Sequence, residues 1–238
     1  MTAALVAAIA DACTAGGFDL CATAAAADYD VRVPDDLRLP SVGRPRALTV
    51  VIGNTRALWP VFCRALADDP ALAASSDPLD TYAAQVIGAA VTAACAPSGV
   101  AHAIRYAPEP PPRRLAMQRL AEVAGLATLA PSHLAIHPIY GPWFALRAAI
   151  VLDLDGPAPR TPPARACDCA RGCQPALDRA LAAGVPTDAS ELRERWRLWL
   201  AVRDACPVGR AHRYPDIQLR YHYTGERACL ESALAPGV

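Results

Sequence analysis

Residues 137–147 read His-Pro-Ile-Tyr-Gly-Pro-Trp-Phe-Ala-Leu-Arg, and the chain continues with Ala-Ala-Ile-Val-Leu. The proline after His137 favours an extended histidine. Gly141-Pro142 predicts a turn that delivers a strand over 143–153. Taken alone, the aromatic residues after the turn indicate core packing, and the histidine indicates a hydrogen-bonded structural residue rather than a ligand. The prediction of the fold therefore starts from this turn and strand.

A second apolar run, Ala47–Gly53, contains β-branched residues and predicts a strand that is buried on both faces. A helix is predicted over 3–13, because Gly16 and Gly17 follow it as a stop signal. Another helix is predicted over 78–94, since Asp77 is a favourable N-cap and proline suits the first helical position.

The C-terminal third holds a third helix signal. Asp188 and Glu191 form a capping box for a helix that runs to Ala205. The remaining expected elements are strands over 18–22 and 100–106, helices over 56–67, 114–124 and 226–234, proline-rich connections over 34–45 and 156–174, and an irregular chain between 206 and 225. Alternating strands and helices without a repeat predict a layered α/β or α+β domain.

The composition describes a globular chain of 238 residues, with 53% hydrophobic and 19% charged residues. Lys plus Arg and Asp plus Glu each number 23, so the net charge is zero. Nucleic-acid-binding proteins usually carry a basic excess, and this chain has none. Arginine is the whole basic set, because no lysine occurs. Its planar fork suits carboxylates and phosphates, although high-GC codon usage is the simpler explanation.

No secretion signal or membrane span is expected. The apolar N-terminus lacks a basic region and meets Asp11 early, and no run of 18 uncharged apolar residues follows. Nine cysteines without a secretion signal favour reduced thiols over a disulfide framework. These features predict a cytoplasmic protein without a membrane partner.

Five segments, in order along the chain, resemble the methylmalonic aciduria and homocystinuria type C family. They are 49–59, 76–80, 122–125, 137–147 and 195–205. The resemblance is that of a bacterial-type member of the family. Proteins of that family are cyanocobalamin reductases and alkylcobalamin dealkylases. The pattern at 137–147 is also similar to a signature of epoxyqueuosine reductases and reductive dehalogenases, which share the same core.

The resemblance implies an α+β fold with a nitroreductase-like (flavin reductase-like) central sheet, flanking helices and a C-terminal cap. Residues 1–155 are expected to form the core. Residues 156–238 are expected to form a Pro/Cys-rich loop and a helical cap that complete the same domain. The cofactors implied are cobalamin, FMN or FAD, and glutathione or another low-molecular-weight thiol as cosubstrate.

The resemblance also assigns binding residues. Arg147, Arg203 and Arg227 match arginines that hold the carboxylates of glutathione in relatives, a role that suits bidentate guanidinium groups. For any one of them, a solvated or locally paired arginine is the ordinary alternative. No catalytic residue is assigned. The expected cobalamin-binding residues are Glu122, His133, Ala135, His137, Tyr140, Gly141 and Trp143.

Three of these positions depart from the family. Glu122 stands where relatives have histidine, His133 where they have glycine, and Ala135 where they have cysteine. The segment between Leu129 and Pro131 is also shorter by about a dozen residues, a large change for a connection. Corrin binding is therefore better supported than any particular reaction.

A cysteine cluster is the other departure. Cys167, Cys169 and Cys173 lie close in sequence, and Cys206 offers a distant fourth thiol. The spacing differs from the Cys-x2-Cys-x2-Cys pattern of iron–sulfur proteins. We expect loop thiols here, with a cluster or a zinc site as the less favoured interpretation.

The sequence thus predicts a cobalamin-binding processing protein that removes the upper axial ligand by thiol-dependent dealkylation or flavin-dependent decyanation. A non-catalytic cobalamin carrier is the alternative, and an iron–sulfur reductase related to epoxyqueuosine reductase is the second. Expected partners are cobalamin, a flavoprotein reductase and a downstream cobalamin acceptor. The chain is expected to be a monomer or a weak dimer.

Overall fold

A computed structural model describes residues 2–159 and 172–234, which fall into two compact units. The described part of the first unit covers residues 2–127 and 145–159. The second unit covers residues 128–144 and 172–234. Residues 128–144 thus group with the C-terminal part of the chain, whereas the expected division after residue 155 stays a prediction.

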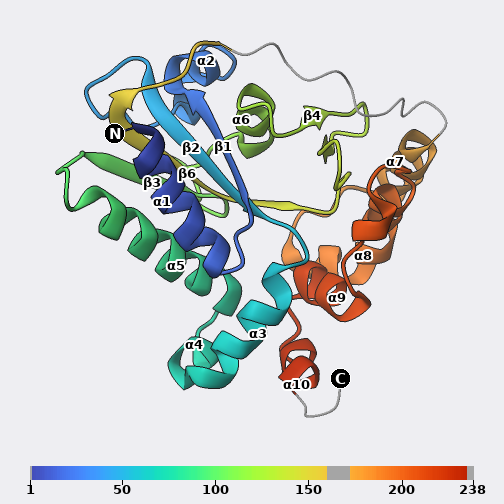
Figure 1. Ribbon diagram of the computed structural model, residues 1–238. Coiled ribbons are helices and arrows are strands. Elements are labelled where there is room, and N and C mark those ends of the chain that lie inside the picture. Colours follow the sequence, from blue (N-terminus) through green and yellow to red (C-terminus); the bar gives the residue numbers. More distant parts are fainter. Residues whose placement is uncertain (1, 160–171, 235–238) are drawn as a thin grey trace. The chain divides into compact units, whose positions relative to one another are not determined.

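The first unit is built on a four-stranded antiparallel sheet (Figure 1). Its strand order is β1 (Leu20–Ala25), β2 (Ala47–Asn54), β6 (Ala145–Asp155) and β3 (His102–Tyr106). All eight residues of β2 are buried, as a central strand covered on both faces requires. The fold class is therefore α+β with a sheet flanked by helices, as the family resemblance implied, and the antiparallel pairing is a finding of the structure.

Helices cover the sheet of the first unit. α1 (Thr2–Ala15) and α5 (Pro78–Cys95) pack side by side against it, while α2 (Ala26–Asp30) contacts α6 (Met117–Val123) (Figure 1). The unit also contains η1 (Asp35–Leu37), α3 (Leu58–Asp68) and α4 (Pro70–Ala74).

The second unit contains a small hairpin and four α-helices among its described residues. The hairpin pairs β4 (Thr128–Leu129) with β5 (Ala135–Ile136). The helical elements are α7 (Cys173–Ala182), α8 (Ala189–Asp204), η2 (Arg210–His212), α9 (Asp216–Thr224) and α10 (Ala228–Leu234). Two apolar clusters fill the unit: one is centred on Leu177 between α7 and α8, and the other on Trp143 and Leu219.

The two predicted N-caps are confirmed. Asp77 Oδ1 accepts the backbone N–H of Asp80 at 3.2 Å, with proline at the first helical position. Asp188 Oδ1 accepts from the backbone N–H groups of Ser190 and Glu191 at 2.8 and 3.0 Å. Glu191 Oε2 accepts the backbone N–H of Thr187. In a standard capping box the bonded N–H belongs to the N-cap residue itself, which here is one position later.

Three sequence expectations are corrected. The stretch between 206 and 225, expected to be irregular, contains α9. Its buried residues include Gln218, Tyr221 and Thr224, so the apolar repeat that signals a helix is missing there. The strand expected from residue 143 begins at Ala145, and the helix expected from residue 114 begins at Met117.

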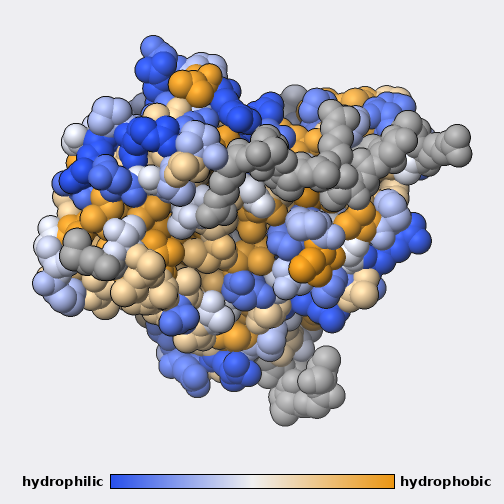
Figure 2. Space-filling view, turned by 45° about the horizontal axis from the view of Figure 1, so that its top comes forward, coloured by the Kyte–Doolittle hydropathy of each residue, from blue (hydrophilic) through white to orange (hydrophobic). Residues whose placement is uncertain are grey.

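The surface mixes apolar and hydrophilic residues. Figure 2 shows both kinds interspersed on the visible face, as the high alanine content of a chain without net charge would give. Large exposed apolar side chains include Val31 and Ile139, which are 81% and 60% exposed. Among the described residues, no helix is long and apolar enough to cross a bilayer.

Candidate functional site

The turn at 137–144 is closed by backbone hydrogen bonds within the second unit. His137 and Gly141 exchange two N–H···O bonds, each of 2.9 Å, and the N–H of Trp143 donates to Tyr140 O at 2.9 Å. This geometry follows from the sequence, because Gly141 adopts a positive φ of 57° that glycine tolerates best. The predicted turn is therefore present.

The His137 side chain stabilises this turn by hydrogen bonds to its backbone. Its Nδ1 accepts the backbone N–H groups of Ile139 and Tyr140 at 3.1 and 3.2 Å. Because both donors point at Nδ1, that nitrogen carries the lone pair and the ring is neutral. The centre of the His137 ring lies 4.6 Å from that of the tilted Tyr140 ring, and the Tyr140 ring meets the His212 ring edge-on with centres 4.8 Å apart. Burial, with a smaller effect of His212, lowers the pKa of His137.

The lowered pKa makes the turn sensitive to acid. Folding favours neutral His137, so its stabilisation is complete above about pH 6.5, the pKa of an unfolded histidine. It is lost as the pH falls from there through the folded pKa. We expect His137→Asn, whose side chain keeps the acceptor, to lose less free energy of unfolding than wild type between pH 7.5 and 5.5. Urea titrations at both pH values measure this, and equal losses in the two proteins would contradict it.

The backbone of the loop after α8 crosses the backbone of this turn in close contact. A Cβ on Gly141 would lie 1.9 Å from Val208 O, and one on Gly209 would lie 2.2 Å from Tyr140 C. Gly209 also has a positive φ, of 71°. Two glycines therefore let the loop after α8 pass directly against the turn. The sequence showed no signal for Gly209, because only the packed loop reveals its neighbour.

Arg203 joins α8 to the same turn. Its Nη2 donates to Pro142 O at 2.6 Å, and its guanidinium carbon lies 4.7 Å from the centre of the Trp143 ring and 5.4 Å from that of Tyr214. Trp143 is 1% exposed. Cation–π contacts of this kind are worth about 0.5–2 kcal/mol. Arg203 therefore contributes to the packing of this unit, whatever else it binds.

Arg147 lies in the first unit and is engaged there. Its Nε donates to Asn54 Oδ1 at 2.7 Å, and its Nη1 lies 3.7 Å from Asp80 Oδ1. The Arg147 side chain is only 11% exposed. Burial and the neighbouring Asp77 raise the pKa of Asp80, while Arg147 lowers it. The guanidinium is thus positioned by two residues that the sequence had not connected to it.

The third expected thiol-binding residue, Arg227, is exposed just before α10. Arg203 and Arg227 belong to the second unit, and Arg147 belongs to the first.

The expected cobalamin-binding residues also divide between the units. Glu122 lies on α6 in the first unit, where its carboxylate pairs with Arg119 at 2.8 Å. His133, Ala135 and the residues of the 137–144 turn lie in the second unit. Within that unit, the structure brings together His137, Tyr140, Gly141 and Trp143.

The shortened segment after Leu129 forms a tight hairpin. Ala130 N–H donates to Leu134 O, and His133 N–H donates to Ala130 O, each at 2.9 Å. His133 is exposed and has φ of 60°, in the left-handed region that favours glycine. A glycine at this position would adopt the same backbone conformation at lower cost. Ala135 is half-buried on β5 opposite Leu129.

The cysteine cluster is described only in part. Cys167 and Cys169 lie outside the described residues. Cys173 is buried at the start of α7, where its Sγ donates to Ser132 Oγ at 3.1 Å, and Cys206 is buried just after α8. In residues 2–159 and 172–234, no group of three metal-ligating side chains is present.

The fold is that of a known class of proteins. The chain is similar over 100% of its length to 98% of a C. elegans B12-trafficking protein, CblC, a homologue of human MMACHC, with a TM-score of 0.72 and 16% identity. An epoxyqueuosine reductase has a TM-score of 0.58 and 13% identity, over 90% of this chain and 68% of that one.

The epoxyqueuosine reductase of Streptococcus thermophilus is similar to the same degree. Its TM-score is 0.57 at 12% identity, over 94% of this chain and 78% of that one. No protein-family model matches the sequence. No curated protein matches it either. The structural likeness agrees with the α+β fold and flanking helices that the sequence resemblance implied, while the nitroreductase-like assignment stays a prediction and function requires separate argument.

Proposed function

We propose that this chain binds cobalamin and serves in its processing or trafficking. The observation that carries the proposal is that the sequence resemblance and the likeness of the fold point to the same family. The sequence resembles the type C family in five ordered segments, and the fold matches CblC, described as a B12-trafficking protein, over the whole length of both chains. A chance match of one motif would not bring the rest of the fold with it.

The more specific proposal is removal of the upper axial ligand. In the dealkylation route, a thiolate attacks the alkyl carbon, a carbon–sulfur bond forms, and the cobalt–carbon bond breaks with both electrons remaining on cobalt. The protein would orient the thiol through guanidinium groups, for which Arg147, Arg203 and Arg227 are the candidates. In decyanation, reduced FMN or FAD would supply the electrons.

The engaged arginines also favour the carrier as a second candidate. Arg147 already contacts Asn54 and Asp80, and Arg203 already donates to Pro142 O. A thiol cosubstrate must share these guanidinium groups with the protein. A carrier that only holds the corrin needs no such sharing. The reductase alternative has weaker support, since its structural relatives have lower TM-scores than CblC.

Methylcobalamin binding tests the proposal. The resemblance to that family implies that the corrin is held with its lower base displaced, so micromolar protein should shift the visible spectrum of methylcobalamin towards the base-off species. Arg193→Ala, which removes an exposed arginine from α8, is the control and should give the same shift. An unchanged spectrum at saturating protein would refute both the processing and the carrier functions.

A further inference from the structure

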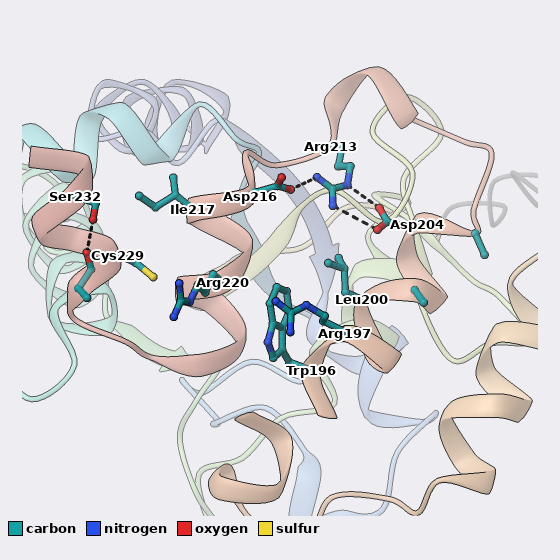
Figure 3. A pocket seen from close by; sticks show the side chains of 13 residues that line it. Trp196, Arg197, Leu200, Asp204, Arg213, Asp216, Ile217, Arg220, Cys229 and Ser232 are labelled. Atoms are coloured by element: carbon teal, nitrogen blue, oxygen red, sulfur yellow. Dashed lines mark hydrogen bonds and ion pairs between the residues drawn. The ribbon is translucent and has the colours of Figure 1, made fainter. Parts of the chain in front are cut away.

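A groove in the second unit is lined by residues other than those assigned above, and one of them, Arg213, has its guanidinium carbon 5.6 Å from the centre of the Trp143 ring. The groove has a volume of about 910 Å³ and lies between α8, α9 and α10 (Figure 3). Small-molecule sites typically have about 300–1,000 Å³. None of the residues assigned to thiol or cobalamin lines it.

The lining combines apolar surface with cationic groups. Trp196, Leu200 and Ile217 supply the larger apolar side chains, and smaller ones come from Ala201, Ala205 and Ala228. Three arginines line the groove against two aspartates, which leaves one positive charge in excess. A groove of this kind favours a ligand with an apolar body and a negatively charged end.

The three arginines differ in what they already bind. Arg213 lies between two carboxylates (Figure 3). Its Nε is 2.7 Å from Asp204 Oδ1, and its Nη1 is 2.6 Å from Asp216 Oδ1. Its charge is therefore neutralised within the protein. Arg213 consequently forms a fixed polar wall of the groove rather than an anion-binding group.

Arg197 and Arg220 are therefore the two arginines of the groove that can bind an anionic ligand. Arg197 lies 5.0 Å above the Trp196 ring, and no carboxylate of the described residues lies within ion-pair distance of it. Arg220 pairs with Glu226 through Nη2, and its side chain is 58% exposed. Exposed pairs of this kind are weak, about 0–1 kcal/mol, so an anion can compete for Arg220.

The thiol that lines the groove, Cys229, is not set up to act as a nucleophile. Cys229 is 4% exposed, and burial raises its pKa more than the neighbouring Arg220 lowers it. A thiol in this state is protonated at neutral pH and behaves as a small apolar group. The groove is thus equipped for binding and not for thiolate attack.

We propose that this groove is a second ligand site, separate from the corrin site, for an aromatic organic anion. The aromatic body would pack on Trp196, Leu200 and Ile217. The carboxylate, sulfonate or phosphate end would bind Arg197 and Arg220 through charge-assisted hydrogen bonds.

Two fluorescent probes test the proposal with the full chain. The first is 8-anilinonaphthalene-1-sulfonate, and the second is N-phenyl-1-naphthylamine, which has the same rings without the sulfonate. Wild type should bind one anionic probe per chain, more tightly than the neutral probe. Replacing both arginines (R197A with R220A) should weaken the anionic probe by about 10-fold or more and leave the neutral probe unchanged. Arg193→Ala, on the exposed side of α8, should change neither affinity.

Two further measurements complete the test. Ile217→Trp, which narrows the groove, should weaken both probes, and saturating hydroxocobalamin should leave anionic-probe binding unchanged in equilibrium dialysis. Equal binding of the two probes to wild type, or unaltered sulfonate binding by the double variant, would overturn the anion site. Displacement of the anionic probe by hydroxocobalamin would overturn its separation from the corrin site. The cobalamin proposal itself rests on the methylcobalamin spectrum and is unaffected by either result.

Discussion

Gly141→Ala is expected to lower the free energy of unfolding by about 2–4 kcal/mol. A positive φ costs an alanine about 1 kcal/mol, and overpacking a well-fitted contact costs about 1–3 kcal/mol more. Both penalties apply, because Gly141 has φ of 57° and its Cβ would lie 1.9 Å from Val208 O. Urea denaturation followed by tryptophan fluorescence measures the change.

Gly225→Ala is the matched control. Gly225 has φ of 66°, but nothing lies within 4 Å of a Cβ placed there. It should therefore show the conformational cost alone, about 1 kcal/mol. Gly209→Ala should resemble Gly141→Ala, and the two together should cost less than the sum, since both disrupt one contact. Equal effects of Gly141→Ala and Gly225→Ala would contradict the backbone crossing.

The parts of the fold that the sequence predicted well are those with local signals. The β-branched run of β2 and the aspartate N-caps of α5 and α8 depend on neighbouring residues only. In contrast, α9 buries Gln218 and Tyr221, so its inward face does not look apolar. Such a helix is stabilised by tertiary packing rather than by its own pattern.

The candidate site was predictable to a smaller extent. The 137–144 turn was recognised from its Gly-Pro pair, because that signal is local. The partners of Arg147, namely Asn54 and Asp80, stand 93 and 67 positions earlier in the chain, and sequence reasoning offered no means to pair them. The groove of α8, α9 and α10 was missed for the same reason, since its arginines come from α8, from the loop before α9 and from α9 itself.

On the proposed dealkylation route, Arg147→Ala is expected to raise the glutathione concentration needed for half-maximal turnover of methylcobalamin by roughly 10- to 150-fold. This corresponds to about 1.5–3 kcal/mol for a charge-assisted contact with a carboxylate. The base-off spectral shift of methylcobalamin should stay close to that of wild type. Single-turnover assays at varied glutathione, with spectral titration of the corrin, separate the two effects.

Two variants separate a thiol-binding role of Arg147 from a structural one. Asp80→Asn removes the carboxylate 3.7 Å from Nη1 but keeps the guanidinium, so it should alter stability and not the glutathione requirement. Arg147→Lys keeps the charge but loses the planar fork, and should fall between wild type and alanine. If Asp80→Asn raises the requirement as much as Arg147→Ala, Arg147 acts through the fold. If wild type binds methylcobalamin but neither dealkylates it with excess glutathione nor decyanates cyanocobalamin with reduced flavin, the chain is a carrier. Glu122, His133 and Ala135, the three departures from the family, would then be the first positions to restore.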